Sequence, residues 1–585
     1  MIKKRFKLIL ILTFLVCTAL IAFGCTHQTK HQLMQHQFDS FMNDIFIQEV
    51  QSDTLSLNYS LAHPENYGIN ENTATFGEYS LNQMKKEWAN SENELKKLQS
   101  YHYSQLTSKQ KLTYEIVKSY LEQQIQFKKY PYYSECLGPT TGIQAQLPIL
   151  LAEFSFNDKQ DIEEYLKLLP CVKDYFADII QYEKEKSKNG LFMSDSVAKR
   201  IIEQCKTFIK NPESNFLIGY FNEKVSNFKG LSKDQIEYYK EQNTEAVLCY
   251  VIPAYQNLIT SLTSLLGTGK NDAGLYYYPK GKDYYECLAQ SKVGSNETMD
   301  QMIELLNAGI NRNMADLNAL TDSDPDVIDK YLDFNSFPLT NPKDILKDLK
   351  KDISKDFPPA VPVNCKIKYV PPSLSEFLSP AMYLVPPIDN FNNNNIYING
   401  NNQKTLSMIY TTVAHEGYPG HLYQCVYFRN QNPAPIRSVL DFTGYDEGWA
   451  TYVELYSYHL AGIDDKLADF LEYNNIIVLC MYARADIGIH YQGWKKAEVV
   501  KFIKQYINDD SAAEQIYDTL LEEPAIYLPY AVGYLQMDSM KNDAESALGE
   551  KFVAKDFHQF LLDIGPAQFE IIKEHMNEWI KNRKK

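Results

Sequence analysis

The feature that most constrains this chain is a short stretch in its last third, TTVAHEGYPGHLY, which begins at Thr411. His415 and Glu416 are adjacent in it, and His421 follows six residues after the first histidine. A His-Glu pair on a helix with a second His downstream is an arrangement that holds zinc beside a general base. Its usual spacing, H-E-x-x-H, puts both imidazoles on one helix face because four residues advance about 400°. Six residues advance about 600°, so an undistorted helix would separate the two rings.

Pro419 and Gly420 lie between the two histidines and offer a way to bring them together. The proline ring clashes with the carbonyl four residues back, which is that of His415, and it removes a helical donor. Gly420 tolerates the backbone angles that such a break requires. The sequence therefore predicts a broken helix, with His421 turned back toward His415. The string alone also fits two ordinary polar histidines at a helix end, with a solvated Glu416 beside them.

A second segment, GYDEGWATYVE from Gly444 to Glu454, supplies carboxylates for the same site. Glu447 and Glu454 are seven residues apart, or about 700°, so both side chains leave one face of a helix. Taken alone, Glu447 would be interpreted as a solvated carboxylate at a helix start. A catalytic zinc ion, however, takes three protein ligands and keeps one position open for water. The predicted ligands of one zinc ion are His415, His421 and Glu447.

Two further roles are predicted around these ligands. Glu416 is the general base that takes a proton from water. Glu454 or Asp446 orients a ligating imidazole through its second ring nitrogen.

Two more segments are predicted to line a cleft beside the metal. In YARADIGIHYQGW, which begins at Tyr482, the residues Asp486, His490 and Trp494 recur every four positions and form one helical stripe. Such a stripe is an unusual core face, which favours a cleft wall over packing. In YLPYAVGYLQ, the phenol of Tyr530 can donate to the oxyanion formed during hydrolysis, and His490 is predicted to assist it. Packing is the alternative for any one tyrosine in a chain that has 43 of them.

The N-terminus indicates a secreted, lipid-anchored protein. Residues 1–24 combine a basic start with an apolar run and form a signal peptide. The sequence Ala-Phe-Gly-Cys that ends at Cys25 resembles a bacterial lipobox, whose cysteine is lipidated and becomes the mature N-terminus. Residues 25–37 are then the lipidated cysteine and a short polar tether. An uncleaved anchor helix is the alternative, and either reading predicts that the body lies outside the cytoplasmic membrane.

The charge balance excludes some partners. The chain has 58 basic and 74 acidic residues, and removal of residues 1–24 takes away four basic ones, so the net charge moves from -16 to -20. So acidic a protein is not expected to bind nucleic acid or to present a polybasic face to a membrane. The lipid on Cys25 is the only predicted membrane contact.

Apolar periodicity predicts a mainly α-helical body over residues 38–585, with no flexible linker that would divide it. Three β-rich runs bounded by prolines and asparagines interrupt the helices and predict a small antiparallel sheet, at about residues 365–399. Helices that carry the metal site are expected at about 405–460, and helices that line the cleft at about 474–545. The edge of the sheet is a place where a metallopeptidase can bind a substrate backbone.

These motifs together resemble the bacterial "domain of unknown function 885" family. The resemblance rests on the motifs HEGYPGH, DEGWA, DIGIH with a tryptophan four residues later, and the final Tyr-x-x-Gly helix. Earlier stretches such as TGIQAQLPILLAEFSF and GLYYYPKGKDYYECL extend it over nearly the whole mature chain. Members of that family are often lipoproteins. The family is similar to helical zinc peptidases such as thermostable carboxypeptidases, angiotensin-converting enzyme and neurolysin-like oligopeptidases.

The resemblance implies a two-lobed helical body around a deep cleft, with the ligands and the base assigned above. Three positions depart from the family pattern or have no counterpart in it. Leu422 stands where the family often has a further histidine, and the site would be disabled if that histidine were the true ligand. The family's DTGxH is DIGIH here. Arg484 can bind a substrate carboxylate, but an internal ion pair is the expected reading in so acidic a chain.

The resulting interpretation is a lipid-anchored zinc peptidase of the carboxypeptidase or oligopeptidase type that hydrolyses short peptides. Two alternatives stay open from the sequence. One is a non-catalytic lipoprotein that binds peptides and retains the fold. The other is a metal-dependent hydrolase of a non-peptide amide.

Overall fold

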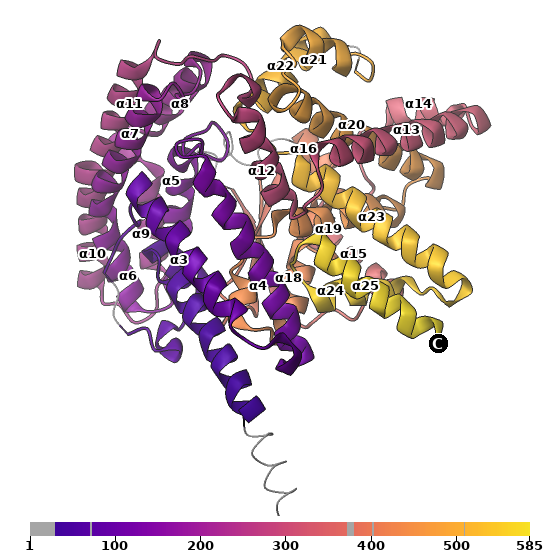
Figure 1. Ribbon diagram of the computed structural model, residues 1–585. Helices are drawn as coiled ribbons and strands as arrows, with labels where there is room; N and C mark the ends of the chain where they lie inside the picture. The colour runs from indigo at the N-terminus through magenta and orange to yellow at the C-terminus, as the bar shows by residue number, and fades with distance from the viewer. Residues whose placement is uncertain (1–29, 71–72, 371–378, 401–402, 508) are drawn as a thin grey trace, which may run out of the picture.

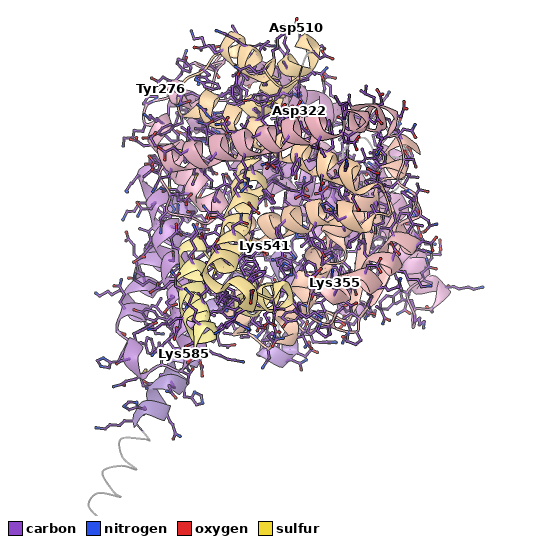
Figure 2. The ribbon with its side chains drawn as sticks, turned by 90° about the vertical axis from the view of Figure 1, so that its right-hand side faces the viewer. Tyr276, Asp322, Lys355, Asp510, Lys541 and Lys585 are labelled. Carbon is purple, nitrogen blue, oxygen red and sulfur yellow. The ribbon has the colours of Figure 1, made fainter. Side chains whose placement is uncertain are left out.

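Most of the chain folds into helices, as its apolar periodicity predicts. The computed structural model describes residues 30–70, 73–370, 379–400, 403–507 and 509–585. The helices of the N-terminal half gather on one side of the molecule and those of the C-terminal half on the other (Figure 1). Figure 2 places Asp510 of the C-terminal half at one end, and Lys585 near the end from which the first described helix leaves. None of the helices in the described ranges is long and apolar enough to cross a membrane.

The N-terminal half is built only from helices. Pro170 separates α6 from α7, and Pro253 opens α11 after a short π-helical turn, so both prolines divide helical runs. Residues 30–50 form the first described helix. The others are α2 (Thr54–Ser60), α3 (Leu81–Gln99), α4 (Ser108–Gln126), α5 (Ile143–Glu153), α6 (Lys159–Leu168), α7 (Val172–Lys188), α8 (Asp195–Phe208), α9 (Phe216–Ser226), α10 (Lys233–Ala246) and α11 (Ile252–Leu265).

The predicted polar tether is only partly described. Residues 30–37 belong to the first helix instead of an extended tether, because Phe38 and Phe41 anchor that helix in a small core with Leu98. Residues 1–29, which include the predicted signal peptide and Cys25, lie outside the described residues.

The C-terminal half holds the longer helices and the sheet. Its helices are α12 (Gly281–Val293), α13 (Met299–Ser323), α14 (Asp326–Asp333), α15 (Pro342–Asp352), α16 (Gln403–Ser407), α17 (Tyr410–Glu416), α18 (His421–Asn430), α19 (Thr443–Tyr456), α20 (Asp465–His490), α21 (Lys496–Ile503), α22 (Asp510–Glu522), α23 (Leu528–Leu548), α24 (Ala554–Ile564) and α25 (Phe569–Lys584).

The three strands form a mixed sheet, which corrects the prediction of an antiparallel one. The strands are β1 (Asn364–Tyr369), β2 (Ala381–Leu384) and β3 (Asn393–Ile398), in the order β1-β3-β2. β2 pairs with β3 antiparallel, but β1 pairs with β3 in parallel. A β-rich run bounded by turn residues identifies a strand without identifying its neighbour, which is why the sequence located the strands and not the pairing.

This sheet lies between two hydrophobic cores. The larger core is formed mostly by the C-terminal half, and the second by residues from 76 to 265. Successive side chains of a strand point to opposite faces. Ala381 and Tyr383 of β2 are buried in the larger core, whereas Met382 and Leu384 cluster with Phe216 of α9, which also packs against the second core.

Two glycines set the distance between α19 and α23, the helix pair with the most extensive contact. A Cβ atom on Gly448 would lie 2.6 Å from the backbone carbon of Gly533, and one on Gly533 would lie 2.4 Å from the oxygen of Gly444. Such distances are shorter than any van der Waals contact, so the two backbones touch only because these residues have no side chains.

The C-terminal end of α20 holds the segment that leads into α23. His490 is 1% exposed; its Nδ1 accepts the N–H of Leu275 at 3.1 Å, so its Nε2–H donates to the carbonyl of Leu520 at 2.9 Å. Asp486 is fully buried and accepts the N–H of Ala525 at 3.0 Å and the hydroxyl of Tyr285 at 2.5 Å. Burial lowers the pKa of His490 to about 4 and raises that of Asp486 to about 7. Both residues therefore support the fold.

The prediction that Asp486, His490 and Trp494 form one stripe of a single helix is wrong. α20 ends at His490, and the chain folds back so that the N–H of Trp494 donates to the carbonyl of Gly488 at 2.8 Å. The indole then covers Gly488, where a Cβ atom would lie 2.2 Å from the ring. The spacing of the three residues is helical, but Gly493 has a positive φ and the helix has already ended.

We expect Gly448→Ala to destabilise the protein by about 2–3 kcal/mol, because the added methyl group forces two helix backbones apart. The measurement is the free energy of unfolding from urea titration. Gly219→Ala in α9 is the matched control, since nothing lies within 4 Å of its Cβ position. There the substitution should raise stability by up to about 1 kcal/mol. Equal effects at the two positions would contradict the close contact.

We expect His490 to make the protein less stable in acid. Its pKa lies near 4 when folded and near 6.5 when unfolded, so the unfolded chain binds the extra proton between these values and stability falls as pH decreases through them. The full effect is about 3 kcal/mol. His490→Gln keeps a donor and an acceptor without titrating in this range. Relative to that variant, the wild type should lose stability from pH 6.5 to pH 4 in urea titrations, and a constant difference would refute the assignment.

Candidate metal centre

The helix that carries the first histidine is interrupted, as the spacing predicts. α17 ends at Glu416 and α18 begins at His421. Between them the N–H of Gly420 donates to the carbonyl of Ala414 at 3.0 Å, which folds the chain back on itself. A Cβ atom on Gly420 would lie 1.8 Å from the carbonyl oxygen of His415, so only glycine fits this bend.

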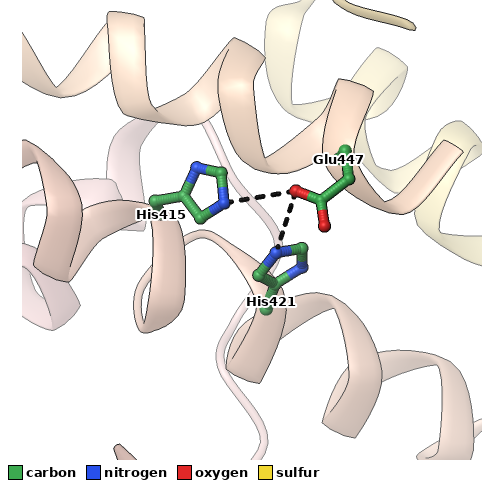
Figure 3. Close-up of side chains that lie close together, drawn as sticks. All are labelled: His415, His421 and Glu447. Atoms are coloured by element: carbon green, nitrogen blue, oxygen red, sulfur yellow. Dashed lines mark ion pairs between the residues drawn. The ribbon is translucent and has the colours of Figure 1, made fainter. Parts of the chain in front are cut away.

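The interruption brings three potential ligand atoms together. Nε2 of His415 lies 3.4 Å from Oε2 of Glu447, and Nε2 of His421 lies 3.5 Å from the same oxygen. Figure 3 shows the two rings reaching that oxygen from neighbouring helices. All three ligand atoms lie within 4.8 Å of one another.

The two nitrogen–oxygen separations, 3.4 and 3.5 Å, are closer to those expected between two ligands of one zinc ion than to those of hydrogen bonds. Ligand bonds of about 2.1 Å in tetrahedral geometry place the ligand atoms about 3.4 Å apart. N–H···O hydrogen bonds are normally no longer than about 3.2 Å. Oε2 of Glu447 is buried and has no hydrogen-bond partner among the described residues. A buried carboxylate oxygen without a partner is costly, and a cation at this point would satisfy it.

Electrostatics point to the same position. Burial alone lowers the pKa of His415, but the carboxylates of Glu447 and Glu454 outweigh burial and raise that pKa well above its ordinary value. Glu416 acts in the same direction on both histidines. Three carboxylates around two imidazoles leave an excess of negative charge, which a divalent cation balances.

Glu454 has the position predicted for an orienting carboxylate. Its Oε2 lies 2.9 Å from Nδ1 of His415, so Nδ1 carries the proton and the lone pair of Nε2 points toward Glu447 and the candidate metal position. The other candidate, Asp446, makes no hydrogen bond to the ring of His415 or His421 among the described residues, and burial raises its pKa to about 7.

Glu416, the predicted base, is held by the sheet. Its Oε2 accepts the backbone N–H of Tyr383 at 2.8 Å, from the edge of β2 that does not face β3. Tyr530 approaches from α23, and the centroid of its ring lies 6.4 Å from that of His415. Burial and Glu447 raise the pKa of Tyr530, so its hydroxyl stays protonated and can donate.

Two structural supports were not predicted. Nε1–H of Trp449 donates to the carbonyl of Pro419 at 2.9 Å and fixes the bend between the two histidines. This tryptophan lies within the DEGWA motif, so its place next to Glu447 was the available signal. The sequence could not indicate the role of the N–H of Tyr383, because every residue type except proline offers the same donor.

Several predicted site residues lie elsewhere. Asp486 and Trp494 take the structural places described above, and both ring nitrogens of His490 are occupied by backbone groups, so it has none left for an oxyanion. Leu422 is fully buried in the larger core, while His421 points to the cluster. Arg484 makes no ion pair with any described residue; it packs over Trp494 and donates to Gln492 at 2.8 Å.

Comparisons with known proteins agree on the fold and the family. The structure superposes on a "putative lipoprotein" from Colwellia psychrerythraea with a TM-score of 0.81 and 18% identity, over 94% of this chain and 99% of that one. A "putative lipoprotein of unknown function" from Shewanella oneidensis gives a TM-score of 0.63 and 15% identity, over 92% and 99%. No curated protein matches the sequence. The model of the family described as bacterial protein of unknown function (DUF885) matches residues 64–576, and the chain therefore belongs to that family.

Proposed function

We propose that this protein is a zinc-dependent hydrolase of short peptides, anchored by lipid outside the cytoplasmic membrane. The observation that carries the proposal is the convergence of His415, His421 and Glu447 at separations that suit tetrahedral zinc, with Glu416 beside them. A His-His-Glu set favours zinc over magnesium or calcium, which prefer oxygen ligands.

Zinc in such a site lowers the pKa of a bound water and polarises the carbonyl of a substrate. Glu416 takes the proton of the attacking water and passes it to the leaving amine. The N–H of Tyr383 keeps the carboxylate of Glu416 oriented through its second oxygen. Tyr530 donates its hydroxyl proton in a hydrogen bond to the substrate oxygen as negative charge develops there. The catalytic roles thus belong to Glu416 and Tyr530.

The arrangement of the sheet supports a peptide as the substrate. β2 presents its free edge beside Glu416, and an extended peptide can add to that edge through backbone hydrogen bonds. The position of the sheet between two hydrophobic cores supports a two-lobed body with the substrate in a cleft between the lobes, as in the helical zinc peptidases. A cleft of this kind favours short peptides over folded proteins.

The proposed anchor rests on two observations. The N-terminal sequence ends in a lipobox-like motif at Cys25, and the two structural relatives are described as lipoproteins. Lipid on Cys25 would hold the body at the membrane surface through the first helix.

Substitution of the two site glutamates should separate their roles. We expect Glu416→Gln to keep zinc and to lower hydrolysis by at least about 10²–10⁴, because a general base is lost while the ligands remain. Glu447→Gln should instead release zinc at a lower chelator concentration, because a charged ligand is lost. The measurements are zinc content by elemental analysis, chelator titration and turnover of a mixed peptide library. Glu203→Gln, on the exposed face of α8, is the matched control.

Two results would count against the proposal. A Glu416→Gln variant as active as wild type would refute the mechanism even with zinc present. Wild-type protein fully loaded with zinc but inactive on peptides of every length would favour a peptide-binding lipoprotein, or a hydrolase of another amide.

Tyr530→Phe should lower kcat with little change in zinc content or KM, because its hydrogen bond to the substrate oxygen strengthens only in the transition state. The loss of one such donor typically costs about 10²–10³ in rate. Tyr534→Phe, one turn further along α23, is the control, since its ring is buried beside Asp538. Equal effects of the two substitutions on kcat would show that Tyr530 acts only through packing.

A further inference from the structure

An open cavity of about 400 Å³ lies between α5, α8 and the turn that leads into α9. The fifteen described residues that line it fall within 139–149, 200–208 and 211–216, all in the N-terminal half. None of them belongs to the sheet or to α17, α18 and α19, the helices of the candidate metal ligands. Small-molecule sites usually have volumes of about 300–1,000 Å³, and this cavity falls within that range. It is therefore a candidate ligand site apart from the candidate metal centre.

More than half of the lining is neutral and polar. Five of the fifteen residues carry side-chain amides, three carry hydroxyl groups and six are apolar. Charged residues make up 23% of the chain, so about three would be expected among fifteen, but the half-exposed Arg200 is the only one. Its Nη1 lies 2.7 Å from Oε1 and 2.6 Å from Oε2 of Glu522, a buried carboxylate that balances its charge. The lining thus offers a ligand mainly neutral hydrogen-bonding groups.

Part of the polar lining holds the wall together. Nε2 of Gln144 donates to the carbonyl of Gly138 at 2.6 Å and to Oε1 of Gln204 at 3.1 Å. Nε2 of Gln204 donates in turn to the carbonyl of Pro139 at 2.6 Å. These bonds join α8 to the segment that begins α5, so this wall is formed before any ligand binds.

The exposed polar side chains of the lining are free to bind a ligand. Thr207, Asn211 and Ser214 are exposed and make no side-chain hydrogen bond to any described residue. Each can both donate and accept a hydrogen bond. A ligand with several hydroxyl groups, which also donate and accept, can pair with such a set in either direction.

Two partly buried aromatic rings, Phe208 and Phe216, complete the lining beside these groups. Their centroids lie 5.7 Å apart and their planes meet at 65°, so the rings pack edge to face. They therefore leave no slot between parallel rings of the kind that binds a flat nucleobase. A single aromatic ring can instead pack against the C–H face of a sugar.

We propose that this cavity binds a neutral saccharide. The proposal goes beyond the proposed hydrolase and does not depend on it. Sugar hydroxyls would bond to the free amide and hydroxyl groups, and the C–H face of the sugar would cover an aromatic ring. A peptide would find no strand edge, because the walls come mainly from helices, whose backbone groups are already paired. An anionic ligand would compete with Glu522 for Arg200, and a cationic one would find no carboxylate in the described lining.

The first test is isothermal titration calorimetry of the full mature chain in detergent micelles. The neutral probes are the trimers of N-acetylglucosamine, glucose and xylose, and the charged probes are the trimers of glucosamine and galacturonic acid. We expect at least one neutral probe to bind with a Kd of about 1 mM or lower. Each charged probe should bind at least about tenfold more weakly, because its charge would be desolvated without a free partner. No binding of any neutral probe at about 10 mM, or tighter binding of a charged probe, would overturn the proposal.

Removal of the free polar groups should weaken binding of the best neutral probe. Thr207→Ala combined with Asn211→Ala should keep the fold, because neither side chain is hydrogen-bonded to a described residue. We expect the Kd to rise by about tenfold, because two neutral hydrogen bonds to the ligand are lost. Asn257→Ala combined with Thr260→Ala, on the exposed face of α11, is the matched control and should leave the Kd unchanged. Equal effects of the two pairs would overturn the proposal.

A second variant fills the cavity without removing a polar group. Ala145 lies within α5, lines the cavity and is partly buried, so Ala145→Leu adds carbon atoms to the space of the ligand. We expect the Kd to rise at least about tenfold, with Ala89→Leu on the exposed face of α3 as the control. Urea titration shows whether each variant is folded, and the Thr207 and Asn211 pair decides the outcome if Ala145→Leu is not. Unchanged binding by folded Ala145→Leu would place the saccharide elsewhere and overturn the proposal.

Discussion

The contact between the backbones of α19 and α23 at Gly448 and Gly533 is the constraint on which the candidate site depends. Glu447 directly precedes the first glycine, and Tyr530 lies about one turn before the second, so the same contact places a candidate metal ligand and the proposed hydroxyl donor. Trp449 follows on the other side and binds the carbonyl of Pro419. Three consecutive residues thus supply a ligand, a close helix contact and a clamp on the bend between the histidines.

Two side chains of the candidate site are each held by a further polar group. Glu454 fixes the ring of His415, and the N–H of Tyr383 fixes the carboxylate of Glu416. Further away, Asp486 and His490 bind backbone groups of the segment that leads into α23. They therefore fix the start of α23, the helix that carries Tyr530. Buried polar groups with full sets of partners give one arrangement a clear advantage over its alternatives.

Much of the candidate site could be predicted from local spacing, and the predictions that were wrong share one cause. The break between His415 and His421 followed from six-residue spacing and the chemistry of Pro419 and Gly420, both of which act within a few residues. The role of His490 could not be predicted in this way, because its partners Leu275 and Leu520 are distant in the sequence.

The predictions of the strand pairing and of the position of Trp494 were wrong for the same reason. β-rich runs between turn residues located the strands, but their pairing is decided by tertiary contacts. Spacing placed Trp494 on a helix that ends four residues earlier. Local patterns thus identified elements and ligand types, whereas long-range hydrogen bonds decided which side chains reach the site.

The candidate metal ligands and the proposed base are held by different elements. All three candidate ligands belong to α17, α18 and α19, and the supports of the ligands come from α19 itself, so the cation site is complete within the larger core. The proposed base adjoins the same candidate ligands, but the donor that orients it comes from β2, whose Met382 and Leu384 belong to the same apolar cluster as Phe216 of the N-terminal half. Because the proposed substrate lies along that same strand, its binding and the orientation of the base depend on one element.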